Sequence, residues 1–117
     1  MKGIFIAGTD TGAGKTVVTG CLARFLLERG YNVITQKWIE TGCGEKFSSD
    51  INEHLKIMGR DKNDIKDYLN CRYTYKFKVA CSPHLASQIE NKRIDANKII
   101  RSFKSLFSKF DFVLVEG

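Results

Sequence analysis

A run of glycines and hydroxyl-bearing residues near the N-terminus has the composition of a phosphate-binding loop. It reads Gly-Thr-Asp-Thr-Gly-Ala-Gly-Lys-Thr over 8–16 of the 117-residue chain. Small residues let successive backbone N–H groups point at phosphate oxygens, and a helix that begins at the loop adds a partial positive charge. In such a loop Lys15 reaches the β- and γ-phosphates of a nucleotide, and the Thr16 hydroxyl ligates Mg²⁺. The predicted phosphate-binding residues are Thr9, Asp10, Thr11, Gly12, Ala13, Gly14, Lys15 and Thr16.

The loop pairs with an acidic residue at the other end of the chain. The ending Gly-Lys-Thr matches a Walker A motif, although the spacing from Gly8 to Gly14 is one residue longer than usual. The apolar run Val113-Leu114-Val115 ends at Glu116. Apolar strands often end in an acid, so this pattern alone is weak. Together with the loop it favours a Walker B strand, whose acid helps to hold Mg²⁺.

Hydrophobic periodicity predicts the elements that position the loop. The apolar run 3–7 predicts a buried parallel strand, and the helical spacing over 15–29 predicts a helix that Gly30 ends. The β-prone residues 31–36 follow directly. These three elements make a βαβ unit with a right-handed crossover, and we expect its two strands to be neighbours in the sheet.

The rest of the chain predicts a larger α/β sheet. A loop over 38–49 comes first. The further predicted elements are a helix at 50–58 capped by Ser48 or Ser49 and stopped by Gly59, an extended segment at 72–77, a helix at 84–90, a helix at 95–110 capped by Asp95, and a buried, central strand at 111–117. We therefore expect residues 1–117 to form one nucleotide-binding domain, a three-layer parallel sheet of the P-loop NTPase type. A central strand at the end of the chain suggests the N-terminal portion of a longer domain.

Composition narrows the class of protein. Hydrophobic residues make up 43% and charged residues 27%, a globular balance, and the net charge of +6 suits an anionic ligand. The lysines and arginines are scattered, which argues against a nucleic-acid partner. No run approaches the roughly 18 apolar residues of a membrane span. The four cysteines form no CxxC pair, and we expect a cytoplasmic protein. His54 and His84 lack metal-ligand spacing, and we expect His54 to lie on a helix surface.

Four short elements follow the phosphate loop in a fixed order. They are Lys37 with Ile39-Glu40-Thr41-Gly42, Ser49-Asp50, Ser82-Pro83-His84, and Val115-Glu116-Gly117. With the loop over 8–16 and its longer spacing, they resemble the motifs of the dethiobiotin synthetase family across nearly the whole chain. Trp38 departs from that family, which has proline after the lysine, and this departure raises the question of how Lys37 is aimed.

The resemblance implies an activity and a set of roles. The family makes dethiobiotin from 7,8-diaminopelargonic acid, CO₂ and ATP with Mg²⁺, by way of a carbamic–phosphoric anhydride. It implies that Lys15 and Lys37 lie between the anionic carbamate and ATP, and that Thr11 and Thr41 hydrogen-bond the carbamate. Thr16, Asp50 and Glu116 would hold Mg²⁺. The resemblance also implies a homodimer for a full-length enzyme.

Other interpretations stay open at this point. An amide ligase of the cobyrinic acid a,c-diamide synthase type would carry the same loop, with a glutaminase domain further on. A non-catalytic nucleotide-binding fragment is a second alternative. A partitioning ATPase is disfavoured, because its deviant Walker A motif needs a lysine at the position of Asp10.

Overall fold

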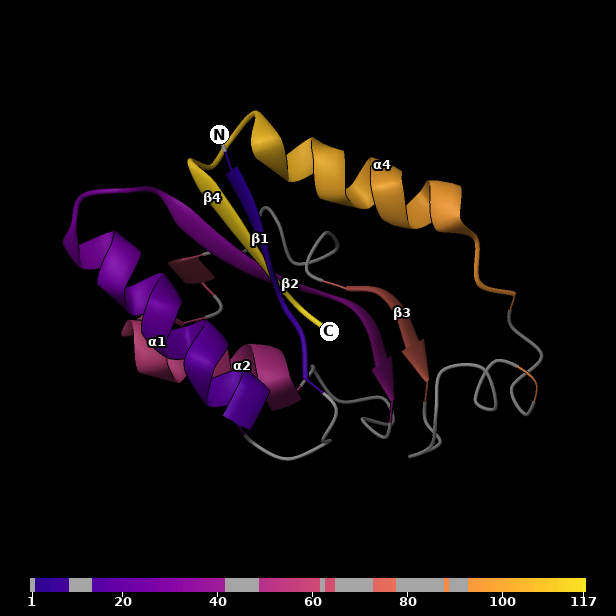
Figure 1. The fold of residues 1–117 in the computed structure, drawn as a ribbon, viewed down its shortest axis with the longest axis horizontal. Helices are drawn as coiled ribbons and strands as arrows, with labels where there is room; N and C mark the ends of the chain where they lie inside the picture. Colours follow the sequence, from indigo (N-terminus) through magenta and orange to yellow (C-terminus); the bar gives the residue numbers. More distant parts are fainter. Residues whose placement is uncertain are drawn as a thin grey trace.

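The computed structural model describes residues 2–8, 14–41, 49–61, 63–64, 73–77, 88 and 93–117, with the main chain alone at 40, 41, 49 and 73–77. The helices and strands are β1 (Lys2–Ile6), α1 (Gly14–Glu28), β2 (Val33–Thr41), α2 (Ser49–Met58), β3 (Tyr73–Phe77), α4 (Ala96–Phe107) and β4 (Phe112–Glu116). Within these residues the strands form a parallel sheet in the order β1-β4-β2-β3 (Figure 1).

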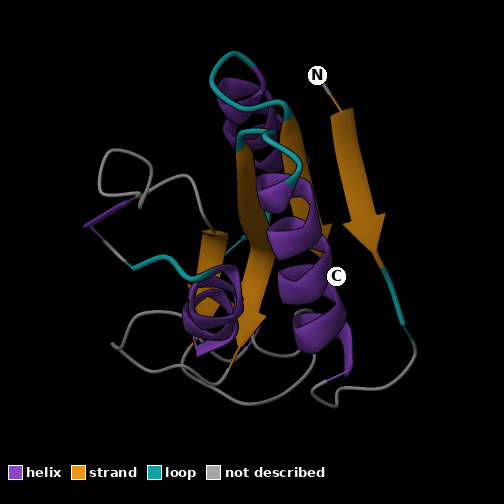
Figure 2. Cartoon of the chain, turned by 90° about the vertical axis from the view of Figure 1, so that its left-hand side faces the viewer, coloured by secondary structure: helices purple, strands orange, loops and turns teal. Residues whose placement is uncertain are grey.

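Helices cover both faces of this sheet. Alternate side chains of a strand point to opposite faces, so β2 and β4 each supply two layers. One cluster holds Val33 and Leu114 against α1 and α2, and the other holds Ile34 and Val113 against α4. Figure 2 shows the helices on either side of the strands. The three-layer parallel α/β architecture of P-loop type is therefore confirmed.

Glycine and capping residues in the sequence predicted most of the helix ends correctly. Gly30 and Gly59 follow α1 and α2 with φ angles of +90° and +72°, the left-handed conformation that favours glycine after a helix. Asp95 caps α4, where its side chain accepts a hydrogen bond from the Asn97 N–H at 2.9 Å. The helix ends at Phe107 rather than at Phe110 as predicted. The predicted helix at 84–90 lies, apart from residue 88, outside the described residues.

The order of the strands confirms one expectation and corrects two others. The strand at 111–117 was expected to be central, and β4 does lie between β1 and β2. The sequence alone suggested instead that β1 and β2 are neighbours, which is wrong. It also predicted a buried first strand, but Phe5 is 53% exposed. Among the described strands β1 lies at the edge and pairs with β4 alone, so its apolar side chains are less covered.

The second strand is longer than predicted. It continues through Thr41, because its last residues pair with β3, from Lys37 opposite Tyr73 to Thr41 opposite Phe77. The residues from 38 to 41 are thus strand and not the predicted loop. In the described part of the chain, each helix is too short or too polar to cross a membrane.

Candidate active site

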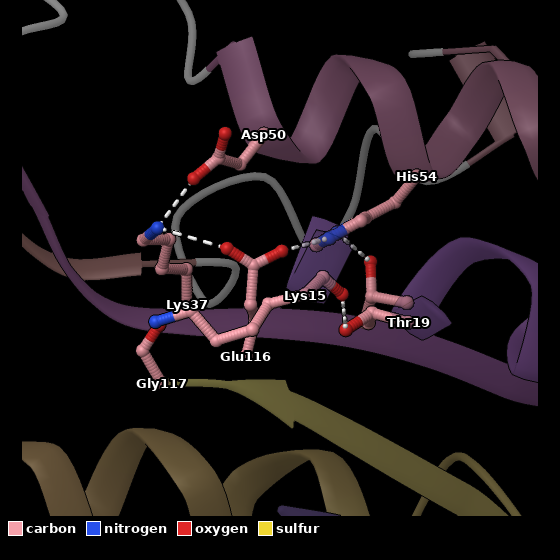
Figure 3. A network of polar contacts seen from close by, with 8 residues as sticks. Lys15, Thr19, Lys37, Asp50, His54, Glu116 and Gly117 are labelled. Carbon is pink, nitrogen blue, oxygen red and sulfur yellow. Dashed lines mark hydrogen bonds and ion pairs between the residues drawn. The ribbon is translucent and has the colours of Figure 1, made fainter. Parts of the chain in front are cut away.

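The phosphate loop begins and ends at the carboxyl edge of the sheet. β1 leads to Gly8, and α1 begins at Gly14. Lys15 Nζ donates to the carbonyl of Gly117, just beyond β4, at 3.3 Å (Figure 3). A Cβ added at Gly8 would lie 3.2 Å from the Lys15 side chain, so the missing side chain leaves room for this lysine. Lys15 therefore extends over the edge where parallel α/β sheets bind their ligands.

The strands β2 and β4 and the helix α2 bring charged side chains together near the first turn of α1. Lys37 lies opposite Glu116 in the register of β2 and β4, so their side chains share one face of the sheet. Lys37 Nζ donates to Glu116 Oε2 at 3.0 Å and also to Asp50 Oδ2, from the first turn of α2. In Figure 3 the ammonium lies between the two carboxylates. The register places Lys37 within β2, which continues beyond the predicted end at residue 36.

The Glu116 carboxyl group is ionised at neutral pH. Its burial acts to raise the pKa of the carboxyl. Hydrogen bonds from His54 and Lys37, the charge of Lys37 and a hydrogen bond from Thr16 act in the opposite direction, and together they lower the pKa from 4.5 to about 2. The contact with Thr16 joins the Walker-type acid to the first turn of α1. The site therefore presents a hydroxyl and a carboxylate side by side.

The lowered pKa predicts a specific acid sensitivity. A carboxyl whose pKa is depressed on folding contributes stability above its unfolded pKa, and that stability is lost as the pH falls through the folded pKa. For Glu116 this window extends from about pH 4.5 down to about pH 2. The free energy of unfolding of Glu116→Gln should vary less with pH across this window than that of the wild type. Denaturant titrations at a series of pH values measure the difference, and equal slopes would contradict it.

His54 was placed on a helix surface by sequence reasoning, and that prediction is wrong. The side chain is fully buried, because its face of α2 packs onto the sheet. Its Nε2 lies 2.8 Å from Glu116 Oε1, and its Nδ1 lies 2.9 Å from Thr35 Oγ1. A usable signal was present, since His54 follows Asp50 by four residues and therefore shares its helix face. His54 thus belongs to the same polar network.

Trp38 does not change the direction in which the Lys37 side chain points. Neighbouring residues of a strand point to opposite faces, so the indole faces α4 while Lys37 faces α2. The ring centroid of Trp38 lies 5.3 Å from that of Phe5 and 5.9 Å from that of Phe103. Its Nε1 donates to Gln36 Oε1 at 3.1 Å. The residue that replaces proline is therefore part of the opposite layer.

Several predicted site residues lie beyond what the structure describes. Thr41 is within β2, at the carboxyl edge, but its side chain is not among the described ones. The predicted residues outside the described ranges are Thr9, Asp10, Thr11, Gly12 and Ala13. The motif elements Gly42 and Ser82-Pro83-His84 lie outside them as well. The described site is thus Gly14, Lys15, Thr16, Lys37, Asp50 and Glu116, with His54 in addition.

The fold and the site together define a P-loop protein that uses nucleotides. The sheet is parallel, a glycine-rich loop precedes its first helix, and the neighbouring strand ends in an acid. The chain belongs to the AAA domain family, whose model matches residues 2–117.

Curated relatives agree with the motif resemblance. The chain is 45% identical over 116 residues to the ATP-dependent dethiobiotin synthetase BioD 2 of Haemophilus influenzae. The matched region covers 99% of this chain and 60% of that protein. It is 48% identical over 120 residues to the ATP-dependent dethiobiotin synthetase BioD of Chlorobaculum tepidum. Here the matched region covers 100% of this chain and 49% of that protein. The chain spans about half the length of the curated relatives it matches. The predicted resemblance to dethiobiotin synthetases is confirmed.

Proposed function

We propose that this chain supplies the nucleotide and metal site of an ATP-dependent dethiobiotin synthetase. Such an enzyme closes the ureido ring from 7,8-diaminopelargonic acid, CO₂ and ATP. The observation that carries the proposal is the position of Lys37, a cation paired with Asp50 and with Glu116, which in turn contacts Thr16 in the first turn of α1. A protein that only holds a nucleotide needs the Walker residues, whereas a synthetase also needs a cation where two anionic substrates meet.

The residues present fit a magnesium ion. Thr16, Asp50 and Glu116 offer a hydroxyl and two carboxylates, the hard oxygen donors that Mg²⁺ prefers, and the Lys37 ammonium already lies between the two carboxylates as a stand-in cation. The described residues contain no cluster of three histidine, cysteine or acidic side chains suited to a metal. That suits Mg²⁺, which is usually held by one or two carboxylates, with water and substrate phosphates as its other ligands. When bound, the ion would neutralise charge on the phosphates.

The chain's own residues would act by neutralising charge and by positioning. One substrate amine takes up CO₂ and loses a proton to give a carbamate. A carbamate oxygen attacks the γ-phosphorus and ADP leaves, which gives the mixed anhydride. The second amine then attacks the carbonyl carbon of the anhydride, expels phosphate and loses a proton, which closes the ring. Lys15 would bind the β- and γ-phosphates, and Lys37 would lie between carbamate and γ-phosphate. Thr11 and Thr41 would hold the carbamate by hydrogen bonds.

The reaction gives a direct test. Phosphate release by the purified protein should require ATP, the diamine and bicarbonate together, and omission of either the diamine or bicarbonate should abolish it. Release that depends on an amide nitrogen donor instead would support a ligase of the cobyrinic acid a,c-diamide synthase type. Nucleotide binding without any release would support a non-catalytic fragment. Both outcomes would overturn the synthetase proposal.

The assembly and location follow from the same resemblance. We infer a cytoplasmic homodimer for the full-length enzyme, with ATP, the diamine and CO₂ as its small-molecule partners and neither nucleic acid nor membrane among them. The likeness to the synthetases over 98–100% of this chain supports that inference. The molar mass in solution tests the dimer, and a mass equal to one chain would contradict it.

The two carboxylates should act through the metal rather than as general bases. Asp50→Asn and Glu116→Gln should each raise the Mg²⁺ concentration that gives the half-maximal rate, because each removes a charged oxygen ligand. Glu53→Gln is the matched control, since Glu53 is on the same helix with its side chain 55% exposed. A titration of rate against Mg²⁺ at saturating ATP measures the effect. An unchanged Mg²⁺ requirement in both variants would remove the two acids from the metal site.

A further inference from the structure

We propose that His54 is a positioning residue that holds the Glu116 carboxylate in the orientation needed to bind the metal. The inference rests on the proposed function, because it takes Glu116 as a metal ligand. Among the described residues, the polar contacts of His54 are with Thr35 and Glu116. It would act on the site through its contact with Glu116.

The geometry of the ring supports this role. Thr35 on β2, His54 on α2 and Glu116 on β4 form one chain of contacts, with distances of 2.9 Å to Thr35 Oγ1 and 2.8 Å to Glu116 Oε1. His54 and Thr35 are fully buried and Glu116 is 3% exposed, so water does not compete for these contacts. Because an ionised carboxylate can only accept, Nε2 of His54 carries the hydrogen and donates it. The ring is therefore fixed at both nitrogens.

The two oxygens of Glu116 have different partners. Oε1 accepts from His54, whereas Oε2 accepts from Lys37. The proposed reaction requires the Lys37 ammonium to turn toward the anionic substrates, which would release Oε2. The contact with His54 is buried, and the proposed reaction does not require it to break. His54 would then keep the carboxylate from rotating while Oε2 changes from one cation to another.

A buried histidine can also serve merely to fill the core, and two substitutions separate these roles. His54→Gln places an amide nitrogen near the position of Nε2 and keeps a donor toward Glu116. His54→Asn places its amide near the position of Nδ1 and loses that donor. The two variants are alike in polarity, and both reduce the packing of the ring. A packing role predicts that they behave alike, whereas a positioning role predicts that glutamine rescues the site and asparagine does not.

The experiment measures metal binding rather than turnover. Mn²⁺ would be titrated into each full-length variant with a non-hydrolysable ATP analogue, and free Mn²⁺ would be followed by electron paramagnetic resonance. Loss of a residue that orients a metal ligand typically weakens metal binding by about 10- to 100-fold. We expect that loss in His54→Asn and a dissociation constant within about threefold of the wild type in His54→Gln. Equal affinities in the two variants, whether strong or weak, would overturn the proposal.

A second pair of variants keeps the proposal testable if the histidine variants do not fold. Thr35→Val removes the hydroxyl that anchors Nδ1 with little change of shape, and Thr35→Ser retains it. Valine should weaken Mn²⁺ binding while serine preserves it, and equal affinities would again overturn the role. These measurements need no diamine. Failure of the proposed reaction, seen as phosphate release without the diamine, is therefore distinguishable from failure of the His54 inference.

Discussion

Lys15→Ala is expected to abolish ATP-dependent turnover and to weaken Mg·ATP binding severely. The loss of a single donor from a preorganised anion site costs about 3–4 kcal/mol, or roughly 100- to 1,000-fold in rate, and Lys15 adds a full charge. The protein should remain folded, because the described contact of the ammonium is an exposed hydrogen bond to the Gly117 carbonyl. Nucleotide affinity by calorimetry and phosphate release by a coupled assay measure the two losses.

Lys56→Ala is the control for Lys15→Ala. Lys56 is a lysine of α2 whose side chain is 75% exposed and pairs at 3.6 Å with Glu53 on the same helix. An exposed pair of this kind contributes little to stability, and its removal should leave nucleotide binding and turnover unchanged. If Lys15→Ala instead keeps both its ATP affinity and its turnover, the Walker A assignment is wrong.

Lys37→Ala should cripple turnover that depends on the diamine while sparing most of the ATP affinity. The ammonium is needed where carbamate and γ-phosphate meet, so its loss should slow that reaction by more than about tenfold, which corresponds to over about 1.4 kcal/mol. ATP binding in the absence of the diamine should weaken much less, because the phosphate loop and Lys15 are intact. Rates with and without diamine and bicarbonate, together with ATP affinity, measure the contrast.

Lys37→Met provides the matched comparison for Lys37→Ala. Methionine keeps most of the unbranched stem, so a loss shared by both variants reports the charge rather than the packing of the stem. In the absence of Mg²⁺, both variants also leave Asp50 and Glu116 without the cation that lies between them. If Lys37→Ala converts the diamine at the normal rate, Lys37 has only a structural role, and the synthetase proposal loses its best residue outside the loop.

Features that depend on residues close together in the chain could be predicted from the sequence. The glycine-rich loop and the helix ends at Gly30 and Gly59 are local patterns. The structure confirms both helix ends, and it places Gly8 after β1 and Gly14 at the start of α1, on either side of the loop. The order of the motifs along the chain is also sufficient to indicate the resemblance to the synthetases. Such signals are reliable because backbone conformation and helix capping are decided within a few residues.

The order of the strands and the contacts of each helix face depend on long-range packing, and local sequence patterns did not predict them. β4 lies between β1 and β2, and this pairing joins residues about 80 to 110 positions apart, which no local periodicity records. The same pairing sets Lys37 opposite Glu116. His54 is buried because its face of α2 covers the sheet, a property of the packing partner rather than of the helix. Trp38 faces α4 because strand side chains alternate, and only the pairing of β2 shows which face belongs to the site.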